Sequence, residues 1–124
     1  MKLPKFPTPA QYRSWWTAVR NEVMNKSPNP DDGFKWFGEV SRRTFDELVD
    51  TGGRSRLDQE LAAALTKAQT GDLGRSIAIM EEKMAKAETP MRGRQMLELV
   101  HDWYKLDDGS GHMYSMQDLF GVLL

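Results

Sequence analysis

The stretch whose residue types come closest to catalytic chemistry is Asp50-Thr51-Gly52, which follows the apolar pair Leu48 and Val49. An Asp-Thr-Gly after two apolar residues begins the catalytic loop of retroviral-type aspartic proteases. In such enzymes each of two subunits gives one aspartate, and the two carboxylates share a site so closely that the pKa of one is forced upward. Asp50 is therefore the first candidate for a catalytic residue.

The flanking residues favour a helix end at this place instead of a catalytic loop. Thr44 and Glu47 have the spacing of a capping box, which predicts a short helix over 44–51. Gly52 then falls where a helix commonly ends with a left-handed residue. The next segment, 55–70, is rich in Ala and Leu and predicts a helix where a protease would place strands. We therefore expect no catalytic residue in this chain.

The other acidic and histidine residues give no stronger site. Glu81 and Glu82 are interleaved with lysines, as on a solvated helix face. A calcium loop starting at Asp107 would need an oxygen ligand at its third position, which is Gly109. His101 stands alone on an expected helix, and the chain has no Cys and only 2 His. We expect neither a metal site nor a cofactor.

Arginine and tryptophan residues supply the candidates for a contact surface. Arg92 and Arg94 lie near an expected helix start, where a positive charge is unfavourable to the helix dipole. They are therefore candidates for partner contacts, with an intrachain ion pair as the alternative. The adjacent Trp15 and Trp16 point roughly 100° apart on a helix, so both are buried only if a broad face is covered. The candidate interface residues are Trp15, Trp16, Trp36, Arg92, Arg94 and Trp103.

Composition describes an ordinary globular domain. The chain has 124 residues, of which 40% are hydrophobic and 28% charged, and we expect a single domain over residues 1–124. The net charge is −1, from 17 basic and 18 acidic residues. Nucleic-acid domains normally carry a clear basic excess, so RNA stays open as a partner without support from the charge. No apolar run is long enough for a membrane span or a signal peptide, so we expect a cytoplasmic protein without membrane contact.

Helix-start signals and apolar spacing predict an all-α fold, a compact bundle of six to seven short helices. Thr8-Pro9 and Asn29-Pro30 are typical helix starts. No segment alternates with a period of two, so no strand is expected. The expected helices cover about 9–25, 30–40, 44–51, 55–70, 72–88, 90–105 and 115–123. In 72–88 an apolar stripe is expected to face inward, and it comprises Leu73, Ile77, Met80, Met84 and Ala87.

The order of these elements resembles the Gag capsid region of copia-type LTR retrotransposons over about residues 6–106. The matching positions are Tyr12 and Trp16, then Leu65, Gly71, Leu73 and Ile77, then Arg94, Leu97, Trp103 and Tyr104. The resemblance implies a retroelement capsid-like fold that self-assembles into a particle enclosing RNA and performs no catalysis. Family members usually continue into a basic zinc-knuckle segment and a protease, and this sequence contains neither.

Two functions follow as expectations. The first is a non-enzymatic Gag-like structural protein whose partner is a second copy of itself. The second is a helical protein-interaction module or accessory subunit of a larger complex, such as a Gag fragment put to another use. The surplus of Met, 8 residues, suits adaptable contact surfaces in either case. An aspartic protease remains a third reading on the strength of Asp50-Thr51-Gly52 alone.

Overall fold

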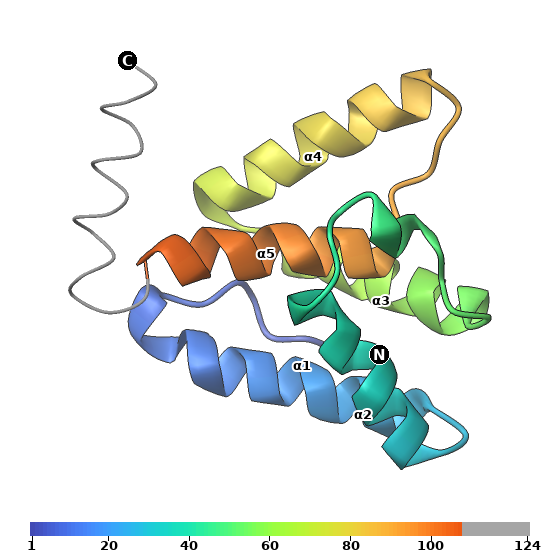
Figure 1. Ribbon diagram of the computed structural model, residues 1–124. Coiled ribbons are helices and arrows are strands. Elements are labelled where there is room, and N and C mark those ends of the chain that lie inside the picture. Colours follow the sequence, from blue (N-terminus) through green and yellow to red (C-terminus); the bar gives the residue numbers. More distant parts are fainter. Residues whose placement is uncertain (108–124) are drawn as a thin grey trace.

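The computed structural model describes residues 1–107, and in this part the chain is built from helices without a strand (Figure 1). The all-α class is therefore confirmed. The five α-helices are α1 (Tyr12–Lys26), α2 (Pro30–Gly38), α3 (Ser55–Ala68), α4 (Gly71–Lys86) and α5 (Gly93–Asp107). Three 3₁₀ turns accompany them, η1 (Pro9–Gln11), η2 (Glu39–Ser41) and η3 (Glu47–Val49).

The number of helices differs from the expected six to seven. The segment 44–51 forms only the turn η3, and the expected helix 115–123 lies outside the described residues. The capping box of Thr44 and Glu47 does form: the Thr44 amide donates to Glu47 Oε1 (2.9 Å) and the Glu47 amide donates to Thr44 Oγ1 (3.2 Å). Only a few residues separate this box from Gly52 and Gly53, which is too short a span to repay the cost of nucleating an α-helix.

Helix α5 runs through the middle of the molecule, with α1 and α2 on one side and α4 on the other (Figure 1). Helix α3 packs along α5, and α2 packs along α1. Apolar residues from all five helices and from the segment before α5 meet in one core. Its buried members are Trp15, Val19, Val23, Trp36, Phe37, Val40, Leu57, Leu61, Ala62, Leu65, Leu73, Ile77, Met91, Met96, Leu97, Val100 and Tyr104.

The residues before α1 form an extended strap that is tied to three helices. The Trp15 Nε1–H donates to the Pro4 carbonyl (2.9 Å), and the Phe6 amide donates to the Ala68 carbonyl at the end of α3 (3.0 Å). The Tyr104 hydroxyl donates to the Pro7 carbonyl. Because these donors belong to buried or half-buried side chains and to the backbone, the strap is part of the fold and covers the end of the core.

Helix α4 ends in a Schellman motif that separates it from α5. The Glu88 amide donates to the Ala85 carbonyl and the Thr89 amide to the Met84 carbonyl, both at 2.9 Å. Glu88 takes the left-handed conformation that this motif requires, with φ of 59°. The chain then turns back and reaches the start of α5 through an extended segment. The backbone of α4 diverges from α5 toward its C-terminal end (Figure 1), where the half-buried Met84 still packs against the core.

Candidate functional site

The Asp50-Thr51-Gly52 motif is a structural turn in this fold. Asp50 Oδ1 accepts from the Gly52 amide (2.8 Å), and Gly52 has φ of +64°. The carbonyls of Asp50 and Thr51 accept from Arg94 Nη2 (2.6 Å) and Trp36 Nε1 (2.8 Å). The motif thus closes a turn whose backbone is fastened to α2 and α5, and it follows η3 instead of the expected helix.

Arg94 is the side chain that gathers the η2 and η3 region onto α5. It is only 2% exposed, and its Nη1 donates to Glu39 Oε1 (2.6 Å) and to the Trp36 carbonyl (3.2 Å). Its guanidinium lies over the Trp36 ring, 4.8 Å from the centroid. Burial acts to raise the pKa of Glu39, but the hydrogen bond and charge of Arg94 lower it on balance. The intrachain ion pair considered as the alternative for Arg94 is therefore what the structure contains.

The start of α5 is capped by a carboxylate from another helix. Asp58 of α3 is 2% exposed, and its two oxygens accept from the Gly93 amide (2.6 Å) and the Arg94 amide (3.0 Å). Gln95 Oε1 accepts from the Arg92 amide (2.9 Å). Because this cap lies at Gly93, the helix begins there and not at the expected residue 90. The sequence carried one signal, since Asp58 shares an apolar helix stripe with Leu61 three residues later.

The six candidate interface residues do not form one surface. Trp15, Trp36 and Arg94 are buried, at 4%, 5% and 2% exposure, which leaves them little area to offer a partner. Trp16 is half-buried, with its ring 4.8 Å from that of Phe37 and 5.1 Å from that of His101, measured between centroids. Both tryptophans of α1 are therefore covered, because α1 lies against α2, α5 and the N-terminal strap.

The two remaining candidates, Arg92 and Trp103, differ in whether the chain itself uses them. Arg92 is half-buried and its Nε donates to the Val49 carbonyl (3.3 Å), so it too serves the η3 turn. Trp103 is 40% exposed on α5. Of the six, Trp103 is the residue that the fold leaves available for a partner, and its role there stays a prediction.

His101 lies in the aromatic cluster between α1 and α5. Its Nδ1 is 2.9 Å from the Tyr12 hydroxyl, and burial lowers its pKa below the ordinary value of 6.5. The fold therefore favours the neutral imidazole, and this contribution to stability is lost as the pH falls below about 6.5. The histidine is explained by packing and hydrogen bonding.

Glu98 is the most strongly perturbed carboxyl group in the described part of the chain. It is 9% exposed, and burial, the hydrogen bond to Asp102 and the charge of Asp102 raise its pKa from 4.5 to about 7, while Lys105 acts in the opposite direction. The two carboxyls lie one helical turn apart on α5. A protonated Glu98 that bonds Asp102 removes the repulsion between them, so the pair is stable without a ligand.

We expect Glu98→Gln to change how stability depends on pH. The folded chain holds a proton on Glu98 that the unfolded chain releases above pH 4.5, so this group makes the protein less stable as the pH rises from 4.5 to about 7. Glutamine is neutral at every pH, and the variant should gain stability relative to wild type over this interval. Urea midpoints at both ends of the interval measure this difference.

Asp102→Asn serves as the companion variant for this prediction. It removes the hydrogen-bond partner and the charge that raise the pKa of Glu98. We expect it to weaken the same pH dependence partly, because the burial of Glu98 remains. A stability difference between Glu98→Gln and wild type that does not change with pH would contradict the prediction.

A hollow with a mostly apolar lining lies between α4 and α5. Its cavity volume is 230 Å³, and it is lined by Leu73, Ser76, Ile77, Met80, Leu99, Asp102 and Trp103. Met80 is 39% exposed and the neighbouring Ile79 is 50% exposed. Met80 was expected to face inward with Ile77 and Met84. It is instead on the rim of the hollow, whereas Met84, one turn later, is half-buried and packs against the core. Of the 16 residues of α4, only Leu73, Gly74 and Ile77 are buried.

A second hollow, of 430 Å³, lies at the start of α3. Lys26, Arg54 and Arg56 line it together with Glu60 and apolar or small residues. Arg54 is already paired with Asp32, at 3.7 Å between Nη2 and Oδ2. The described residues contain no cluster of three His, Cys, Asp or Glu that could hold a metal ion. Within residues 1–107, no helix has both the length and the apolar character needed to cross a bilayer.

The fold and the α4–α5 surface define a small all-α protein in which the buried Asp58 carboxylate and the Arg94 guanidinium bond to groups of the same chain. Comparisons with protein-family models, with curated proteins and with solved structures gave no match.

Proposed function

We propose that this chain is a non-enzymatic, Gag/capsid-like structural protein that self-assembles into particles of the retrotransposon type. The observation that carries the proposal is the exposed apolar surface formed by Ile79, Met80 and Trp103. These are three of the five large apolar side chains exposed in the described residues, and all three lie on α4 or on the facing side of α5. Contiguous apolar surface of this kind marks a site of protein contact.

The rest of the structure supports a role in binding. The residues with perturbed pKa values, such as Glu98 and His101, are held by packing and by hydrogen bonds inside the chain. Asp50, the strongest candidate for catalysis in the sequence, closes a turn. The resemblance of the helix order to copia-type Gag supports the finer statement that the contact is between copies of one chain. Particle lattices are assembled from small, individually weak interfaces, which suits a surface of this size.

The test is the solution mass of the full chain as a function of concentration. Sedimentation equilibrium should show a mass that rises from one copy at micromolar concentration to two or more copies at millimolar concentration. Electron microscopy at the highest concentration then looks for particles. A chain that stays monomeric over the whole range overturns self-assembly.

A helical interaction module in a larger complex is the second candidate, because Met80 and the half-buried Met84 lie along the same side of α4. Methionine is unbranched and adapts to differently shaped partners. This function predicts a monomer that binds one different protein in a fixed ratio, and the mass measurement separates it from self-assembly.

A further inference from the structure

One face of α4 is exposed to solvent, and at its edge Ser76 and Met80 line the hollow beside α5. Five residues of α4 lie on a single side of the helix, because a helix turns 100° per residue and they follow one another at intervals of four, three, one and three residues. They are Asp72, Ser76, Ile79, Met80 and Lys83. All five are exposed. We call these five residues the α4 face.

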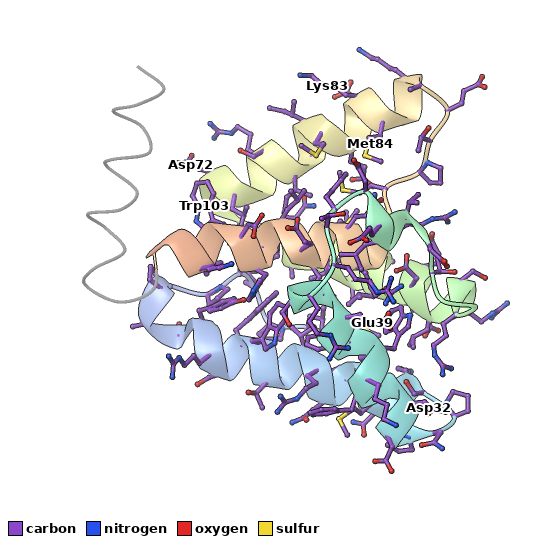
Figure 2. The ribbon with its side chains drawn as sticks, in the orientation of Figure 1. Asp32, Glu39, Asp72, Lys83, Met84 and Trp103 are labelled. Carbon is purple, nitrogen blue, oxygen red and sulfur yellow. The ribbon has the colours of Figure 1, made fainter. Side chains whose placement is uncertain are left out.

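The charges of the α4 face are separated by its apolar centre. Asp72 lies at the start of the helix near Trp103, and Lys83 lies three turns further on, toward the far end (Figure 2). Within residues 1–107, the ion pairs of the structure involve neither Asp72 nor Lys83. The acidic residues Glu81 and Glu82 are more than 100° away from the centre of this face around the helix. The α4 face is therefore acidic at its N-terminal end, apolar in its centre and basic toward its C-terminal end.

We propose that the α4 face binds the same face of a second copy, with the two α4 helices antiparallel about a two-fold axis. In that arrangement Asp72 of each copy lies opposite Lys83 of the other, so one complementary pair is formed twice by symmetry. The axis passes between residues 77 and 78, which brings the small Ser76 opposite Ile79 of the second copy. This inference rests on the proposed self-assembly and specifies the surface and orientation that it uses.

The order of the charges along the α4 face favours an antiparallel second copy over a parallel copy and over a different partner. A parallel pair would set Asp72 against Asp72 and Lys83 against Lys83, and like charges face to face disfavour it. Met80, at the α5 edge of the face, and Trp103 beside it would lose their contact with water when the second copy binds. An acidic or basic partner would match only one end of the face, whereas a second copy matches both.

The test reverses one charge at a time. Asp72→Lys gives a face with lysine at both ends, and Lys83→Asp gives a face with aspartate at both ends, so each variant alone repels its own copies. We expect the dissociation constant of each variant to rise about tenfold, from two attractive surface pairs turned into two repulsive ones. A mixture of the two variants restores both pairs, and the mixed dimer should bind within about threefold of wild type.

Two control variants carry the same changes of charge elsewhere. Asp31→Lys reverses an acid in the first turn of α2, and Lys67→Asp reverses a base in the last turn of α3, both exposed. These variants match the changes in net charge and in helix-dipole energy. We expect neither of them to weaken self-association by more than the change in net charge does. We also expect a mixture of the two to form no preferred mixed dimer. Thermal melting of every variant shows that the monomer is folded.

A second measurement does not depend on charge. The chain has no cysteine, so the variants Ser76→Cys and Ile79→Cys each carry a single thiol. In a mixture of the two, every disulfide therefore joins two copies, which are either one of each variant or two of the same variant. The antiparallel arrangement predicts that the mixed disulfide dominates over both self-linked dimers. If wild type self-associates but the mixed variants show no preference in either experiment, the inference is overturned and the proposed function stands. A wild type that never associates overturns both.

Discussion

Gly93→Ala is expected to lower the free energy of unfolding by about 3 kcal/mol, because the start of α5 touches the backbone of α3. A Cβ added at Gly93 would lie 2.4 Å from the Asp58 carbonyl oxygen and 2.8 Å from the Ala62 amide nitrogen. Both are backbone atoms of a helix, and they cannot turn away as a flexible side chain could. The two helices would have to move apart, which would also stretch the bonds from Asp58 to the start of α5.

Gly38→Ala is the matched control for this prediction. Gly38 ends α2 with φ of −62°, and no atom lies within 4 Å of a Cβ added there. The same chemical change should therefore be neutral or stabilise the protein by up to about 1 kcal/mol, through the loss of freedom in the unfolded chain. Urea unfolding of both variants measures the contrast. If Gly93→Ala is as stable as Gly38→Ala, then α3 and α5 do not approach as closely as described.

Asp58→Ala is expected to cost about 3 kcal/mol of unfolding free energy. The variant removes the acceptor of the Gly93 and Arg94 amides, and both amides remain buried under α3 without a partner. Hydrogen bonds to a charged acceptor are stronger than neutral ones, and an unpaired buried donor also loses its bonds to water. The first turn of α5 should then fray, and the turn at Asp50, which Arg94 binds through the Asp50 carbonyl, should loosen with it.

Asp58→Asn and Asp31→Ala separate the causes of that loss. The asparagine keeps one oxygen acceptor but sets its NH₂ group against the second amide, so its stability should lie between those of wild type and Asp58→Ala. Asp31 is an exposed acid in the first turn of α2, and Asp31→Ala should cost no more than about 1 kcal/mol. Equal effects of Asp31→Ala and Asp58→Ala would show that the Asp58 carboxylate is not the cap of α5.

The sequence predicted the parts of the fold that depend on local signals. The apolar stripe through Leu61 and Leu65 placed α3 correctly to within two residues, and the capping box of Thr44 and Glu47 forms as its spacing predicts. The sequence did not predict that Asp58 caps a helix whose first residue, Gly93, lies 35 positions further along the chain. Such a cap depends on how α3 and α5 pack, and no local pattern encodes that.

The candidate surface was predictable only in part for the same reason. Trp103 was among the candidate residues, but so were Trp15 and Trp36, and all three have the same side chain. Their burial differs because Trp15 bonds to the N-terminal strap and Trp36 lies under the Arg94 guanidinium, whereas Trp103 lies on the side of α5 that lines the hollow beside α4. Met80 has the helical spacing of a core residue, and it lies instead on the rim of that hollow.

The methyl spectrum of the isoleucines on dilution tests most directly whether a second copy binds the α4 face. Ile77 and Ile79 lie two residues apart on α4, the first 1% and the second 50% exposed. We predict that the Ile79 δ1 methyl resonance shifts progressively with concentration, while the Ile77 resonance moves much less because it is already enclosed by its own chain. In samples whose mass shows self-association, the opposite result is that neither resonance changes with concentration. That result would contradict binding through the α4 face, because the copies would then meet through another surface.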